Sequence, residues 1–229
     1  MKIMQTQIDE IVQSEISKDA KFWYKSPACS KTRENTFAKE ILKEKNLKKL
    51  DSIIRINREN YNANHMGETE KDNSNRLEER IALELFNRKD CFSFGKIIDY
   101  QVPLKCKQSD KGIGKIDLLA YDDSKKVLTL LELKKPDSDE TLLRAVLEVY
   151  TYSKLVCEKN LIKSYDYINS DSKIEKAVFL FKNSYAYKEY EKACADKDNS
   201  YIYKLMKKLN VKFYCLDFEF TVSEYKTNI

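Results

Sequence analysis

The sequence predicts an α/β fold in which a central mixed sheet is flanked by helices, preceded by a helical segment at the N-terminus. Apolar residues recur at helical spacing in several stretches, and apolar runs of strand length separate those stretches. After about residue 75 the expected elements follow the order α-β-β-β-α-β-α-β. A chain of 229 residues, 42% of them hydrophobic, is long enough for one such domain with an added segment.

The N-terminal part differs in pattern from the rest of the chain. Residues 1 to about 60 are expected to be helical, because apolar positions such as Phe37, Ile41 and Leu50 stand among lysines and glutamates. The following stretch, to residue 75, is polar and is typical of a linker or long loop. We therefore divide the chain into an N-terminal helical accessory segment with its linker, residues 1–70, and a second domain, residues 71–229.

The elements of the second domain are read from periodicity and turn residues. Short turn-like segments between the first three strands favour antiparallel hairpins, and Asp137, Ser138 and Asp139 are available to cap the helix that follows them. The expected elements are a helix over about 75–88, strands at 97–104, 114–121 and 127–134, a helix over about 140–157, a strand at 177–181, helical residues over 187–209 broken near 196–199, and a last strand at 211–221.

Several classes of protein are excluded by composition. The six cysteines have no CxxC or CxH spacing, which argues against a zinc module and a disulfide framework, and the single histidine, His65, excludes a site built from several histidines. The N-terminus lacks the apolar core of a signal peptide, and no apolar run approaches the roughly 20 residues of a membrane span. We expect a cytoplasmic protein without a membrane partner, whose chemistry rests on carboxylates and lysines.

Charged residues stand at the end of an otherwise apolar strand. Glu132 and Lys134 are two positions apart in the strand at 127–134, so they project from the same face. If Asp122 pairs with Val127 across the turn, equal steps backward bring Asp117 opposite Glu132. Two carboxylates so close repel unless a cation neutralises them, and Mg²⁺ prefers such oxygen ligands. We expect these side chains to converge on one face at an open edge of the sheet.

The arrangement Gly114-Lys115-Ile116-Asp117, a turn, then Leu131-Glu132-Leu133-Lys134 resembles the signature of the PD-(D/E)XK nuclease superfamily. The expected α-β-β-β-α-β order is similar to the core of that restriction endonuclease-like fold, over about residues 75–185. The resemblance implies that Asp117 and Glu132 bind Mg²⁺ or Mn²⁺, with the Leu133 carbonyl as a further ligand. It implies that Lys134 orients the attacking water and offsets charge on the phosphate. Ile116 replaces the proline of the signature.

Members of this superfamily often carry a further acidic residue on the first core helix. Glu78 is our first choice for this catalytic carboxylate, because it borders the apolar stripe of the helix over 75–88, and Glu79 is the second choice. Glu84 lies further from the stripe. Each of these residues could equally be a solvated glutamate of an amphipathic helix.

The second core helix of the superfamily frequently carries a polar residue followed four positions later by tyrosine. Glu148 and Tyr152 look similar, although Glu148 replaces the usual glutamine, and Arg144 lies on the same stripe. Arg144 and Glu148 could instead form an i,i+4 ion pair. We select Arg144, Tyr152, Lys115 and Lys135 as candidates for contact with nucleic acid.

The resemblance implies a metal-dependent nuclease, with DNA rather than RNA as the expected substrate and restriction, repair or anti-phage defence as possible settings. A net charge of +5 is compatible with such a polyanionic partner. One alternative is a non-catalytic nucleic-acid-binding or assembly subunit that retains the fold. Another is an interaction protein built around its N-terminal helices, which could also mediate a homodimer or bind a regulatory protein.

Overall fold

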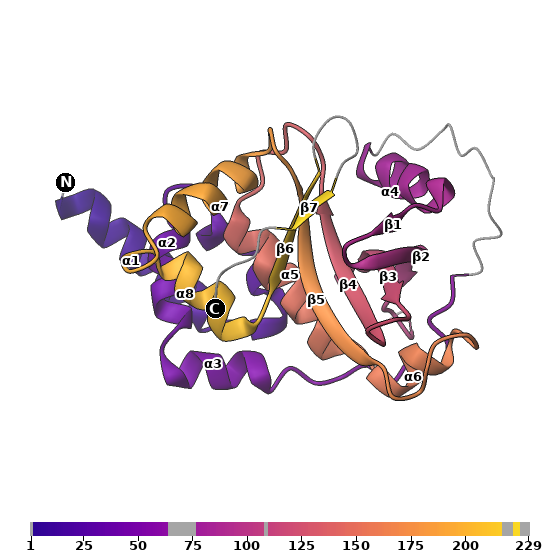
Figure 1. The fold of residues 1–229 in the computed structure, drawn as a ribbon. Helices are drawn as coiled ribbons and strands as arrows, with labels where there is room; N and C mark the ends of the chain where they lie inside the picture. The colour runs from indigo at the N-terminus through magenta and orange to yellow at the C-terminus, as the bar shows by residue number, and fades with distance from the viewer. Residues whose placement is uncertain (1, 64–76, 108–109, 217–221, 225–229) are drawn as a thin grey trace.

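A seven-stranded sheet runs through the middle of the molecule, with helices on both of its faces (Figure 1). The structure is a computed structural model, and it describes residues 2–63, 77–107, 110–216 and 222–224. The strands lie side by side in their chain order. Their bounds are β1 Cys91–Phe92, β2 Gly95–Pro103, β3 Lys115–Asp122, β4 Val127–Lys134, β5 Lys173–Phe181, β6 Lys212–Leu216 and β7 Val222–Glu224.

Both pairing directions occur in this sheet. β1 to β4 form an antiparallel meander, β4, β5 and β6 run parallel, and β7 pairs antiparallel with β6. The parallel pair β4–β5 requires a crossover, which α5 supplies on one face of the sheet. The prediction of an α/β fold with a mixed sheet flanked by helices is confirmed.

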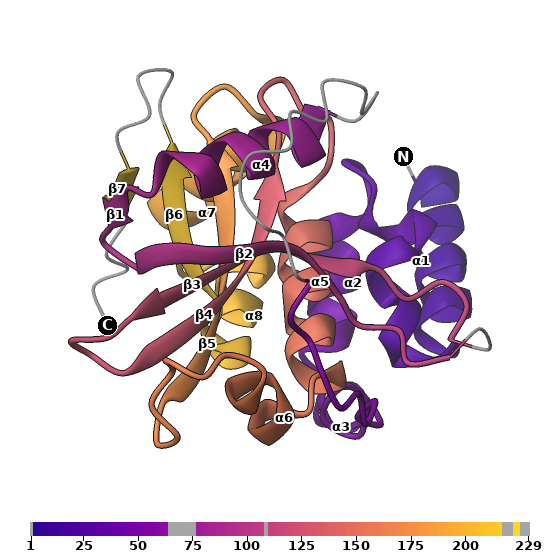
Figure 2. The same ribbon diagram turned by 90° about the vertical axis from the view of Figure 1, so that its right-hand side faces the viewer.

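The helices divide between the two faces of the sheet. The N-terminal helices pack with α5, α7 and α8 against one face, and α4 covers the other (Figures 1 and 2). The helical bounds are α1 Lys2–Ile16, η1 Ala20–Lys25, η2 Pro27–Cys29, α2 Glu34–Ile41, α3 Glu44–Asp51, α4 Leu77–Arg88, α5 Leu142–Leu155, α6 Glu158–Lys163, α7 Tyr185–Ala195 and α8 Tyr201–Leu209, with η1 and η2 being 3₁₀ turns.

Most predicted elements are present with shifted ends. β4 has the predicted bounds, whereas α5 begins two residues later than predicted because Thr141, and not a residue of 137–139, is its N-cap. The Thr141 hydroxyl accepts from the Arg144 amide at 3.3 Å and donates to the Cys29 carbonyl at 2.6 Å. The contact with η2 therefore fixes the start of α5, and local sequence could not reveal it.

The largest departures lie near the C-terminal half of the sheet. β5 begins at Lys173, four residues before the predicted start, because it pairs along the whole length of β4. The predicted break near 196–199 is confirmed: α7 ends at Ala195 and Ser200 caps α8. The sequence reading missed β1, α6 and β7. The predicted last strand is β6 as far as Leu216, and its remaining residues, 217–221, lie outside the described part.

The N-terminal helices share one core with the sheet. Val12, Trp23 and Phe37 are buried in the same apolar cluster as Val146 of α5 and Leu130 of β4. The polar stretch 64–76, which contains His65 and the predicted boundary between residues 70 and 71, lies outside the described residues. Within the described part, no helix has the length and apolar character needed to cross a membrane.

Two neighbouring carboxyl groups, of which Glu34 is buried, should make stability depend on pH. Glu34, at the start of α2, is buried against Glu189 of α7, and burial together with the Glu189 carboxyl raises the Glu34 pKa to about 10. A carboxyl with a raised folded-state pKa contributes stability that is complete below its unfolded pKa and is lost as pH rises toward the folded pKa. Stability should therefore fall between about pH 5 and 9, by up to about 1.4 kcal/mol per pH unit.

Replacing Glu34 by glutamine should flatten this dependence and raise the urea unfolding midpoint at pH 8. Glu44→Gln is the matched control, because Glu44 occupies the same position at the start of α3 but is exposed. Urea unfolding of the three proteins at several pH values measures the slopes. Equal slopes for wild type and Glu34→Gln would show that this pair does not govern the dependence.

Candidate active site

The β3–β4 hairpin carries the three residues predicted from the sequence signature. Asp122 pairs with Val127, as predicted, and the same register continued toward the other end of the hairpin brings Asp117 opposite Glu132. Lys134 is the last residue of β4. Leu118 and Leu131 are the last pair of the observed ladder, so the strands begin to separate where the polar residues start.

The faces of β4 are those expected from alternation. Leu130 belongs to the apolar cluster that includes α5, and Leu131 belongs to the cluster that includes α4. Glu132 and Lys134 share the α5 face with Leu130. Lys134 contacts Glu148 of α5 and Glu140 just before it, and it also donates to Glu132. The chain therefore buries two charged residues in a layer that is mostly apolar.

Asp117 is held by one donor on each carboxylate oxygen. Its Oδ1 accepts from the Gln101 amide nitrogen Nε2 at 2.9 Å, and its Oδ2 accepts from the Leu133 backbone N–H at 3.0 Å. Each oxygen keeps a further lone pair. Asp117 is half-buried, and these bonds aim its carboxylate at the peptide between Glu132 and Leu133.

The Lys134 ammonium lies among three carboxylates. Its Nζ is 2.8 Å from Glu132 Oε1, 2.6 Å from Glu140 Oε2 and 3.1 Å from Glu148 Oε2. Glu132 and Lys134 are each 4% exposed, so the site is recessed and not the open edge that we expected. Glu140 and α5 cover it, and the second oxygen of Glu132, Oε2, is buried without a hydrogen-bond partner in the described structure.

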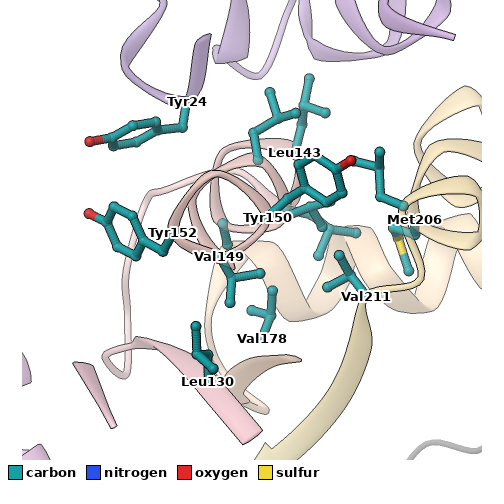
Figure 3. Packing of buried hydrophobic residues seen from close by; sticks show 14 of the residues in the cluster. Tyr24, Leu130, Leu143, Val149, Tyr150, Tyr152, Val178, Met206 and Val211 are labelled. Atoms are coloured by element: carbon teal, nitrogen blue, oxygen red, sulfur yellow. The ribbon is translucent and has the colours of Figure 1, made fainter. Parts of the chain in front are cut away.

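Tyr152 contacts this cluster through Glu148. Its hydroxyl donates to Glu148 Oε1 at 2.8 Å, and its ring meets the Tyr24 ring edge-on with centroids 5.7 Å apart. Figure 3 shows both hydroxyls pointing to the same side, away from Leu130. Tyr152 is 3% exposed, so it positions Glu148 and is not available for the direct nucleic-acid contact that we predicted. Any Cβ on Gly114 would stand 2.0 Å from this hydroxyl, which explains a glycine there.

The other predicted contact residues lie around the rim. Arg144 Nε lies 3.4 Å from Glu140 Oε1, so the ion pair with Glu148 that we considered is replaced by one with Glu140. Lys115 and Lys135 are exposed at the ends of β3 and β4. All three cations therefore lie near the cluster. Among the described residues, only Arg144 of the three forms an ion pair with it, through Glu140.

The first core helix brings one carboxylate to the same place. Glu78 is half-buried, and its Oε1 accepts from the Lys135 backbone N–H at 3.3 Å, directly after Lys134. Glu79 is also half-buried, whereas Glu84 is exposed. Of the three glutamates that we considered, Glu78 thus has the contact that ties α4 to the end of β4.

Burial and charge crowding shift the pKa values of the cluster. Burial raises the pKa of Asp117 to about 7, against the lowering effect of Lys134. Burial, then the Asp117 and Glu148 carboxylates, raise the Glu132 pKa well above its usual range. Burial alone would lower the Lys134 pKa, but the surrounding carboxylates outweigh it and raise that pKa. The cluster therefore contains more carboxyl groups than a single ammonium can neutralise.

The donor set fits a hard divalent cation with few protein ligands. No group of three or more His, Cys, Asp or Glu side chains among the described residues is arranged to hold a metal ion. Mg²⁺, however, is usually held by one or two carboxylates together with waters and substrate phosphates. The buried Oε2 of Glu132, which accepts no hydrogen bond from the described residues, and the remaining lone pairs of the Asp117 oxygens supply oxygen donors of this kind.

Two members of the cluster were missed by sequence reasoning. Glu140 was taken only as the first residue of a helix, although it lies outside α5 and contacts Lys134. Gln101 was not considered, although it stands opposite Asp117 in the β2–β3 register, between the pairs Tyr100–Leu118 and Val102–Ile116. A glutamine inside the predicted strand at 97–104 was the available signal. Its φ of 49° is a left-handed value that non-glycine residues rarely adopt.

Replacing Gln101 by glycine should separate stability from activity. Glycine relieves the left-handed backbone at a gain of about 1 kcal/mol, but it removes the donor to Asp117 and should lower metal-dependent cleavage about tenfold or more. Lys126→Gly is the matched control, because Lys126 also has a positive φ, 52°, in the exposed β3–β4 turn. Thermal unfolding and cleavage rates of both variants test this. Equal activities would leave Gln101 without a positioning role.

Comparison of the chain with protein-family models, with curated proteins and with solved structures gave no match. The coarse architecture, an α/β fold with a mixed sheet between helices, stands on the structure itself. The resemblance to the nuclease superfamily rests on Asp117, Glu132 and Lys134 and on the order of elements, and it stays a prediction.

Proposed function

We propose that this chain is a Mg²⁺- or Mn²⁺-dependent nuclease that hydrolyses phosphodiester bonds, with DNA as the first substrate to test. The observation that carries the proposal is the excess of carboxylates, with Glu132 buried among them, around one buried ammonium at the end of β4. Burying charge without a partner costs several kcal/mol, and such clusters concentrate at functional sites. A divalent cation would neutralise the excess.

Each residue of the cluster has a role in this proposal. Asp117 and Glu132 would hold the cation, which when bound lowers the pKa of its water and polarises the phosphoryl oxygen. Glu140 and Glu148 hold Lys134 beside Glu132. Lys134 then presents positive charge where negative charge grows on the phosphate in the transition state. Tyr152 keeps Glu148 in the orientation that Lys134 needs.

A cleavage assay tests the proposal directly. Labelled single- and double-stranded DNA and RNA are incubated with the protein in Mg²⁺, in Mn²⁺ and in EDTA, with Asp117→Asn prepared in parallel. We expect cleavage that needs the metal ion and is lost in Asp117→Asn. Binding of nucleic acid without cleavage under every condition would favour the non-catalytic subunit. Neither binding nor cleavage would favour a buried ion cluster with a structural role.

The contribution of α4 is tested by two glutamates of the same helix. Glu78→Ala should lower cleavage about tenfold or more, because Glu78 contacts the Lys135 backbone and its charge acts on Asp117. Glu84→Ala is the control, since Glu84 is exposed on the same helix and should cleave as wild type does. Rates at saturating Mg²⁺ distinguish them. Equal rates would remove α4 from the active site.

A further inference from the structure

A second surface feature lies beside the N-terminal helices. A groove of about 740 Å³ is bounded by the 17–21 segment, by residues 52–57 after α3 and by Cys106, Lys107, Asp110 and Ile113 between β2 and β3. These three segments are far apart in the sequence, and the shared core holds them together. The groove is therefore a property of the folded chain, and the sequence signature of the candidate active site does not account for it.

Positive charge is concentrated along this groove. Its walls carry five cations against two carboxylates, Asp19 and Asp110, an excess of three in a chain whose net charge is +5. Asp19 pairs with Lys21, and Lys18 pairs with Glu15. The five cations are Lys18, Lys21, Lys49, Arg55 and Lys107. Arg55 and Lys107 are exposed on two neighbouring segments of the wall, so both can meet one anionic ligand.

The groove also contains apolar side chains. Ile53, Ile54, Ile56, Ile113 and Leu155 all line it. Ile54 is 85% exposed, a high value for a large aliphatic side chain. A ligand that fits this lining must offer both negative charge and apolar surface along its length.

The loop that carries Ile113 also packs against a residue that supports the candidate active site. Ile113 lines the groove, and its neighbour Gly114 packs on the Tyr152 hydroxyl that donates to Glu148. On the other side, the Gly112 carbonyl accepts from the Tyr24 hydroxyl at 3.3 Å and from the Lys25 ammonium. Residues 112–114 thus link the lining of the groove to Tyr152, which holds Glu148 beside Lys134.

We propose that this groove binds a single strand of nucleic acid that extends from the candidate active site; the inference rests on the proposed function. A single strand offers phosphates to Arg55 and Lys107 and unpaired bases to the isoleucines. A duplex stacks its bases inside and would set charged backbone against the apolar lining. The groove therefore specifies single-stranded substrate, or the unpaired end of a duplex, over a continuous double helix.

Binding in EDTA tests the groove separately from cleavage. The probes are a labelled single-stranded 20-mer and the duplex of the same sequence, each measured by fluorescence anisotropy over a range of salt concentrations. The groove variants are Arg55→Ala/Lys107→Ala and Ile54→Ser. The control is Lys96→Ala/Lys173→Ala, which removes two exposed lysines at the opposite end of the sheet, near the β3–β4 turn.

We expect the wild-type protein to bind the single strand about tenfold or more tightly than the duplex. Losing two phosphate contacts should reduce the slope of log affinity against log salt by about 1.4 in Arg55→Ala/Lys107→Ala. Ile54→Ser should weaken single-strand binding about fivefold or more with an unchanged salt slope, because it removes apolar contact with a base. The control variant should bind as wild type does.

Equal or tighter binding of the duplex, or groove variants that bind as the control does, would overturn the proposal. Equal competition by polyglutamate would also overturn it, since charge alone would then explain binding. If wild type cleaves while the groove variants bind and cleave normally, the groove inference fails and the nuclease proposal stands. If the groove variants lose binding but no protein cleaves, the groove inference stands and the nuclease proposal fails.

Discussion

Glu132→Gln should abolish most metal-dependent cleavage, lowering the single-turnover rate by at least about two orders of magnitude. The amide keeps the size of the side chain and can still accept from Lys134, but it removes an anionic ligand. Metal affinity should fall, and a higher concentration of Mg²⁺ or Mn²⁺ should restore part of the activity. Asp117→Asn should behave in the same way, because Asp117 supplies the other carboxylate.

The stability of Glu132→Gln should move in the opposite direction. Burial and the neighbouring carboxylates already favour the neutral form of Glu132 by raising its pKa, so a neutral amide should cost little and unfolding should require as much urea as in wild type, or more. Calorimetric Mg²⁺ binding and urea unfolding measure both effects, with the exposed Glu84→Gln as control. Wild-type metal affinity in Glu132→Gln would refute its assignment as a ligand.

Lys134→Met should have the largest effect on stability. It removes the only ammonium in contact with Glu132, Glu140 and Glu148 among the described residues and should cost about 3–5 kcal/mol in the free energy of unfolding. Cleavage by the folded fraction should slow about a hundredfold or more, since positive charge beside the phosphate is lost. Metal binding should remain near normal or become tighter.

A second substitution and added Mg²⁺ separate these effects. Lys134→Met/Glu148→Gln should recover part of the stability, because one uncompensated carboxylate is removed, yet it should stay inactive. Mg²⁺ should raise the unfolding temperature of Lys134→Met more than that of wild type, since the ion replaces the missing charge. Wild-type cleavage by Lys134→Met, or no stabilisation by Mg²⁺, would contradict the mechanism.

The sequence was sufficient to predict the β3–β4 hairpin and the face of its polar residues. Both follow from local rules: the turn sets the Asp122–Val127 pair, and strand alternation then carries Glu132 and Lys134 to one side. The apolar stripe of α4 likewise predicted that Glu78 lies nearer the sheet than Glu84. In the structure Ile81 and Leu85 are buried and Glu84 is exposed, in agreement with this prediction.

Contacts between distant segments could not be predicted in this way. Glu140 meets Lys134 because Thr141 is anchored to Cys29, a contact that spans more than a hundred residues. The left-handed backbone of Gln101 and the burial of Tyr152 under η1 depend on tertiary packing in the same manner. We expected an open site, but the site is recessed. The periodicity of a sequence does not show which distant segments cover the end of a strand.

The position of β4 between an antiparallel and a parallel neighbour has a consequence for the order of folding. Its pairing with β3 needs only a short turn, so Asp117 and Glu132 can meet through local contacts. Its pairing with β5 must wait for α5 and α6 to cross over, because 38 residues separate the end of β4 at 134 from the start of β5 at 173. We therefore expect the two carboxylates to come together early in folding, and the burial of Lys134 with Glu148 to be completed only when the crossover closes.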